Sequence, residues 1–203
     1  MSVKTLTHVD PFDSERERAG AGVLGMWVFI AVVAMIFAAS VLGYLVVRFD
    51  RPPGMEWMPE GTPGLPHALA LSTLLLVVSS WTMQGAVRAA REGRPRGVTS
   101  GLAATLGLAV AFLAIQSLAW AELWRRQATL DSGLYAWTFY VLTGLHALHV
   151  LGGLPPMAIA LRNARAGRYG PSGHAGLVLC AMYWHALDAI WVVLYATLLA
   201  FSN

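Results

Sequence analysis

The sequence predicts an all-α membrane protein, a bundle of five transmembrane helices. Of its 203 residues, 57% are hydrophobic and only 12% are charged, whereas a soluble domain carries roughly 25% charged residues. Apolar stretches recur five times, each close to or above the roughly 20 residues that a helix needs to cross a bilayer core. Backbone polar groups in lipid must pair internally, so stretches of this length indicate helices.

The five stretches are separated by loops rich in proline, glycine and arginine, which favour turns. They span residues 22–47, 68–87, 101–121, 134–161 and 175–201. In the fourth, two glycines and the pair Pro155-Pro156 predict a kink, because proline removes a backbone donor and clashes with the preceding turn. Residues 1–21 are expected to form a retained, solvated tail, since they begin with polar residues of mixed charge, and residues 22–203 one membrane domain.

The arginines predict the orientation of the bundle. With five spans, the tail and the second and fourth loops share one side, which carries ten of the 14 basic residues. These are Lys4, Arg16, Arg18, Arg88, Arg91, Arg94, Arg96, Arg162, Arg165 and Arg168. The positive-inside rule then places the N-terminus in the cytoplasm and the C-terminus outside. This basic excess needs no nucleic acid to explain it.

Few ionisable residues lie inside the predicted spans. His146 and His149 share a face of the fourth helix, and His185 and Asp188 share a face of the fifth. Counted from the cytoplasmic ends, His149 and His185 lie about 18 and 15 Å deep. We expect an interhelical polar cluster of these four residues, with Asp188 accepting from a histidine or itself protonated.

Three functions remain open for this cluster. It can be a structural network, a proton or water pathway, or a b-type haem site with His146 and His185 as axial ligands.

Cys180 is the single cysteine, and no phosphate-binding loop or metal-spaced cluster is found. We therefore expect no catalytic centre, metal or cofactor in this chain. Expected lipid headgroup contacts are Arg88, Arg91, Trp81 and Trp184.

Two motifs resemble those of one family. Residues 143–150 read Thr-Gly-Leu-His-Ala-Leu-His-Val, which resembles the Thr-Gly-x-His-x-x-His-Val signature of subunit III of haem-copper oxidases. Residues 183–191 are similar to the family's Tyr-Trp-His-x-x-Asp-x-x-Trp. Residues 25–30 and Gln116 give further support, and the resemblance covers most of the chain from Gly22 onward.

The resemblance implies the five-helix, short bacterial form of this subunit. Such a subunit holds no haem or copper itself, since these belong to partner subunits. It packs on catalytic subunit I beside the other oxidase subunits and binds structural phospholipids. It supports proton uptake, stability and turnover while the oxidase reduces oxygen and pumps protons. The implied location is the bacterial cytoplasmic (inner) membrane, within a respiratory complex or supercomplex.

Two alternatives stand beside this implication. Nitric oxide reductase accessory subunits share the motif of the fourth helix, and a bis-histidine haem b membrane anchor would use His146 and His185. The sequence also departs from the family, because Val33, Ala119 and Val178 stand where the pattern usually has glutamates. Losing three buried carboxylates removes costly groups together with any proton-linked role they had.

Overall fold

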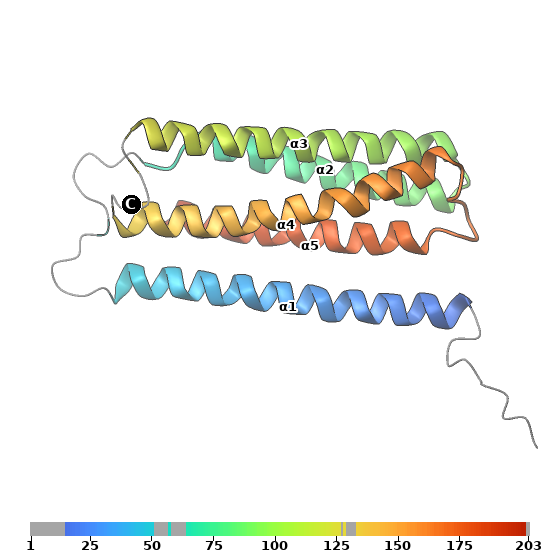
Figure 1. The fold of residues 1–203 in the computed structure, drawn as a ribbon, viewed down its shortest axis with the longest axis horizontal. Helices are drawn as coiled ribbons and strands as arrows, with labels where there is room; N and C mark the ends of the chain where they lie inside the picture. The colour runs from blue at the N-terminus through green and yellow to red at the C-terminus, as the bar shows by residue number, and fades with distance from the viewer. Residues whose placement is uncertain (1–14, 51–56, 58–63, 127, 129–132, 202–203) are drawn as a thin grey trace, which may run out of the picture.

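The computed structural model describes residues 15–50, 57, 64–126, 128 and 133–201. This part of the chain contains five long helices and no strand (Figure 1). The helices are α1 (Glu15–Phe49), α2 (Ala68–Arg91), α3 (Pro95–Arg125), α4 (Leu134–Arg165) and α5 (Ala175–Phe201). Each is long and apolar enough to cross a membrane. The predicted all-α fold with five transmembrane helices is confirmed.

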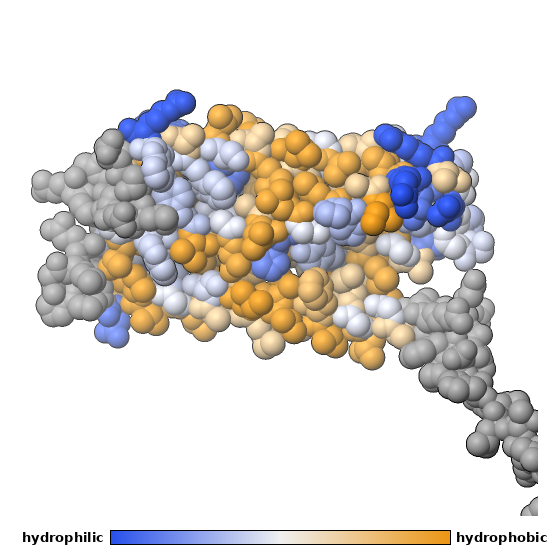
Figure 2. All heavy atoms as spheres, in the orientation of Figure 1, coloured by the Kyte–Doolittle hydropathy of each residue, from blue (hydrophilic) through white to orange (hydrophobic). Residues whose placement is uncertain are grey.

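The helices run side by side, with α1 set apart from the other four (Figure 1). Helix α2 packs against α3 and α5, and α4 packs against α3 and α5. Helix α1 packs against α4 and α5, and in the described residues its backbone does not come close to that of α2 or α3. Figure 2 shows hydrophobic residues across the middle of one face and strongly hydrophilic residues near its two ends. This pattern is typical of a bundle that crosses a bilayer.

Several helices extend beyond the predicted spans. Helix α3 has 31 residues and α4 has 32, which gives lengths of about 46 and 48 Å against a hydrocarbon core of about 30 Å. Helix α1 begins at Glu15, so residues 15–21 of the expected tail are helical, and residues 1–14 lie outside the described residues. The extensions of α3 and α4 carry arginines past the apolar segments. We call the end formed by the α2–α3 turn and the α4–α5 loop the arginine-rich end.

Turn residues at the arginine-rich end explain where the helices stop. Pro95 begins α3, where its missing N–H costs no helical hydrogen bond. Gly93 and Gly167 follow the ends of α2 and α4 with φ of 66° and 67°. This left-handed conformation favours glycine over residues with a side chain. The α2–α3 connection is therefore a tight hairpin.

The predicted kink lies in the second half of α4. Pro155 and Pro156 are inside the helix, and beyond them α4 bends away from α1 toward α3 (Figure 1). A cavity of about 670 Å³ lies between α1, α4 and α5, and Gly152 and Pro156 are among its lining residues. The kink therefore separates α4 from α1 where this cavity lies.

Glycines bring α2 and α3 unusually close together. A Cβ atom placed on Gly101 would lie 2.9 Å from the Ala86 Cβ and 2.9 Å from the Thr82 carbonyl oxygen. A Cβ atom on Gly97 would lie 2.8 Å from the Ala89 Cβ. Such small-residue contacts let two helix backbones approach each other in a membrane.

Replacing Gly101 with leucine is expected to force α2 and α3 apart and to lower the free energy of unfolding by about 1–3 kcal/mol. The measurement is equilibrium unfolding of the purified chain in mixed detergent micelles. Gly107→Leu is the matched control, because Gly107 is exposed and nothing lies within 4 Å of its added Cβ. Equal losses in both variants would contradict close packing at Gly101.

Candidate functional site

Helix α5 is hydrogen-bonded to α2 through three side-chain pairs. The Trp184 Nε1–H donates to Ser79 Oγ at 2.9 Å, and the Trp191 Nε1–H donates to Thr73 Oγ1 at 3.0 Å. Between them, His185 Nδ1 lies 2.6 Å from Ser80 Oγ. We call these pairs the α2–α5 seam.

The hydroxyl groups of the seam satisfy two needs at once. Ser79 Oγ donates to the Leu76 carbonyl at 2.7 Å while it accepts from Trp184. Thr73 Oγ1 likewise donates to the Leu69 carbonyl at 2.7 Å. A hydroxyl has one proton and two lone pairs, so neither the hydroxyl nor the indole is left unpaired in the apolar interior.

A further pair of hydroxyls extends the network to α3. The oxygens of Thr82 and Thr105 lie 2.8 Å apart. Sequence reasoning missed this network, although the α2 segment repeats hydroxyl residues within an apolar span. They are Ser72, Thr73, Ser79, Ser80 and Thr82. Their recurrence was the available signal, because serine and threonine in membrane helices bond either their own backbone or a neighbouring helix.

His146 lies where four helices meet. Its side chain is fully buried, and its ring contacts Phe37 of α1, Phe112 of α3 and Trp191 of α5. The ring centroids lie 6.1, 5.7 and 4.7 Å away, respectively. Neither ring nitrogen has a hydrogen-bond partner. His146 therefore acts here as an aromatic packing residue.

The other members of the expected cluster have different neighbours. His149 Nδ1 lies 2.8 Å from the Leu145 carbonyl oxygen of its own helix, and the Tyr183 hydroxyl donates to the His149 carbonyl at 3.0 Å. Asp188 is 6% exposed and lies close to Ser80. Neither of its carboxylate oxygens has a partner with hydrogen-bond geometry.

The structure brings these four residues to one region of α4 and α5, yet no hydrogen bond joins their side chains, all of which are described. His185 bonds to α2 instead, because Ser80 lies on the helix that α5 packs against. The contacts that join α4 and α5 at this level include the Tyr183 hydrogen bond and the packing of His146 on Trp191. The expected hydrogen bonds are thus replaced by contacts to other groups.

This geometry does not favour a haem between His146 and His185. Two axial ligands must face one space that is large enough for the macrocycle. His146 is enclosed by three aromatic side chains, whereas His185 Nδ1 is directed to Ser80. Across the described residues, no group of three or more His, Cys, Asp or Glu is placed to hold a metal ion.

The expected headgroup residues occupy three kinds of place. Arg88 and Arg91 are exposed in the last turn of α2. Trp81 is 79% exposed but lies ten residues before Arg91, about 15 Å deeper. Trp184 has no exposed surface and its indole is bonded to Ser79. The expectation of a headgroup contact is therefore wrong for Trp184, since a buried side chain cannot reach a lipid.

The positions of the three absent carboxylates are also informative. Val33 and Ala119 are buried, and Val178 is partly buried. An apolar side chain at each position avoids the cost of placing a charge in the membrane interior. At these three positions the chain packs an apolar side chain, whereas the resemblance described above implies an ionisable group.

Fold and site together define a multi-pass α-helical membrane protein whose interior polar groups mainly hold helices to one another. A family model described as cytochrome c oxidase subunit III matches residues 17–203. The chain therefore belongs to the cytochrome c oxidase subunit III family.

Individual relatives agree with this assignment. The chain is 32% identical to a cytochrome c oxidase subunit 3 from Synechocystis, over 84% of this chain and 72% of that protein. It is 31% identical to the protein of the same name from Thermostichus vulcanus, over 92% and 90%. A relative from Formosania lacustris, also a cytochrome c oxidase subunit 3, is 33% identical over 86% of this chain and 67% of that protein.

Replacing Ser79 with alanine is expected to lower the free energy of unfolding by about 1 kcal/mol, because it leaves the buried Trp184 indole without an acceptor. Ser117→Ala is the control, since Ser117 is exposed and bonds only its own helix at the Leu113 carbonyl. A double-mutant cycle with Trp184→Phe checks the pairing. Additive losses would contradict a hydrogen bond between Ser79 and Trp184.

Proposed function

We propose that this chain is a non-catalytic, lipid-binding subunit of a respiratory haem-copper terminal oxidase. It packs on catalytic subunit I and supports proton uptake, stability and turnover during oxygen reduction and proton pumping. The observation that carries the proposal is the family match over residues 17–203. The relatives named above are cytochrome c oxidase subunits, which favours oxygen over nitric oxide as the substrate of the complex.

The contacts of the polar residues support a non-catalytic role. Trp184, His185 and Trp191 are bonded to α2, and His146 is packed among aromatic rings. A catalytic group must be within reach of a substrate or cofactor. In this chain these side chains instead fix the distances between helices, which suits a subunit that stabilises a catalytic neighbour.

The cavity between α1, α4 and α5 supports lipid binding. Its volume of about 670 Å³ suits part of a phospholipid, and its lining includes Phe29, Ile159 and Leu179. Asn163 and Tyr169 line it near the arginine-rich end, where a polar headgroup would lie. A second cavity of about 500 Å³ between α1 and α5 has an apolar lining that includes Phe37 and Val193. An acyl chain suits both linings.

The arginines support an orientation and a location. If the arginine-rich end faces the cytoplasm, then α1 begins there and α5 ends on the outer side. The location that follows for a bacterial respiratory subunit is the cytoplasmic (inner) membrane. The partners are subunit I, other oxidase subunits and membrane lipids, within a single complex or a respiratory supercomplex, and haem and copper reside in those partner subunits.

Removing this chain from the oxidase is expected to leave the initial rate of oxygen reduction per haem close to that of the intact enzyme. The number of turnovers before inactivation should fall, because the catalytic subunit loses a stabilising neighbour and its lipids. The measurement is oxygen consumption over many turnovers, normalised to the haem absorption of the assembled partners.

Restoring the intact chain is the control and should restore the working life. An unchanged working life would contradict the stabilising role. Rapid nitric oxide consumption by the purified complex, with little oxygen reduction, would instead favour a nitric oxide reductase subunit.

A further inference from the structure

The arginine-rich end has a large excess of positive charge. The α2–α3 turn, the α4–α5 loop and the helix turns beside them carry seven arginines and one acidic side chain, Glu92, which is paired with Arg94. The arginines are Arg88, Arg91, Arg94, Arg96, Arg162, Arg165 and Arg168. Figure 2 shows strongly hydrophilic residues gathered where α3 begins and α4 ends. An anionic partner is the natural complement of this surface.

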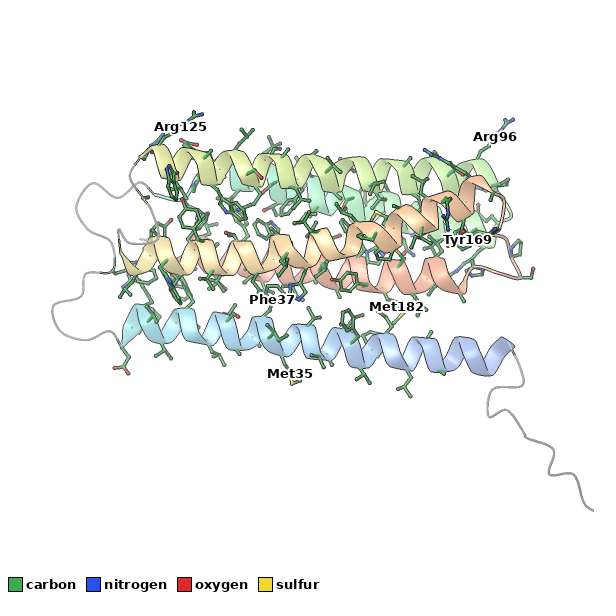
Figure 3. The ribbon with its side chains drawn as sticks, in the orientation of Figure 1. Met35, Phe37, Arg96, Arg125, Tyr169 and Met182 are labelled. Atoms are coloured by element: carbon green, nitrogen blue, oxygen red, sulfur yellow. The ribbon has the colours of Figure 1, made fainter. Side chains whose placement is uncertain are left out.

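A pocket of about 460 Å³ lies within this charged region, between the first turns of α3 and the last turn of α4. Arg96, Thr99 and Ser100 line it from α3, and Arg165 lines it from the end of α4. Figure 3 labels Arg96, whose side chain projects from this end of α3. The pocket therefore has a positive charge on each of two facing helices.

The two arginines of the pocket have no counter-charge from the described part of the chain. Arg94 pairs with Glu92 and Arg126 pairs with Glu122. Neither Arg96 nor Arg165 forms an ion pair with a described acidic side chain. Their guanidinium groups remain available to an anion, and guanidinium binds phosphate oxygens in a bidentate geometry.

The pocket changes from charged to apolar along the helix axis. From Arg96 to Ala103, another of its lining residues, is seven residues of α3, or about 10 Å. Thr99 and Ser100 lie between these two, and their hydroxyls already donate to backbone carbonyls of α3. A phosphate, a glycerol backbone and acyl chains follow one another in the same order. This gradient favours a lipid over a free phosphate.

We propose that the α3–α4 pocket binds the headgroup of an anionic phospholipid, with Arg96 and Arg165 on its phosphate. A zwitterionic headgroup fits less well, because its cationic group would lie beside the two arginines. The site is separate from Arg88 and Arg91 and from the cavity between α1, α4 and α5. The inference rests on the proposed lipid-binding function and names a chemical class of lipid for it.

The test uses the intact complex in mild detergent, delipidated and then titrated with phosphatidylglycerol or phosphatidylethanolamine, with bound lipid counted by native mass spectrometry. The double variant R96Q/R165Q is expected to weaken phosphatidylglycerol binding about thirtyfold, because each of these arginines loses a direct hydrogen-bonded contact with the phosphate that contributes about fivefold. Each single variant should therefore bind phosphatidylglycerol about fivefold more weakly. The single variants allow the same test if the double variant assembles poorly.

The matched control is R88Q/R91Q, which removes the same charge from the same end and should change affinity less than the pocket variant does. Equal losses in the two double variants would overturn the pocket, because the general field of the surface would then explain binding. Displacement of phosphatidylglycerol by an equal concentration of inorganic phosphate would also overturn it in favour of a free phosphate site. If the wild-type complex retains neither lipid, the proposed lipid-binding function fails as a whole, whereas unchanged binding in R96Q/R165Q refutes only this site.

Discussion

The constraint on which this structure most depends is that polar groups inside a bilayer must find partners within the protein. Helix α2 satisfies this constraint with hydroxyl side chains that donate hydrogen bonds to their own backbone and also accept hydrogen bonds from side chains of α5. Ser79 and Thr73 hold the indoles of Trp184 and Trp191, while Gly97 and Gly101 bring α3 against the same helix. Helix α2 is therefore the element around which α3 and α5 are placed, and α4 completes the four-helix core.

Helix α1 is attached in a different way. Phe37 contacts the rings of His146 and His149 in α4, and Phe29 contacts the ring of Tyr183 in α5. Figure 3 shows Phe37 on the side of α1 that faces these helices and Met35 on the opposite side. At the end opposite the arginine-rich end, Arg48 Nε donates to the Phe201 carbonyl at 3.3 Å. Between such contacts lie the two cavities that we assign to lipid. The α2–α5 seam thus fixes the core, and the looser α1 contact leaves space for the lipids that we propose.

Sequence alone predicted the number of helices, their order and the kink at Pro155, because hydropathy and proline act locally along the chain. It did not predict which side chains meet, because that depends on the rotation of each helix about its axis. Trp184 was therefore assigned to the membrane surface although its indole is bonded to Ser79. His185 was expected beside the α4 histidines, but it is hydrogen-bonded to Ser80. A single serine in an apolar segment does not indicate which helix its hydroxyl will bond.

We propose that this chain stabilises an oxidase whose redox centres lie in other subunits. The most direct test is to count haem and copper in the complex before and after the chain is selectively released by detergent. The remaining subunits should keep their full haem and copper, and the released chain should contain neither. Haem or copper that leaves in fixed proportion to the chain would contradict it.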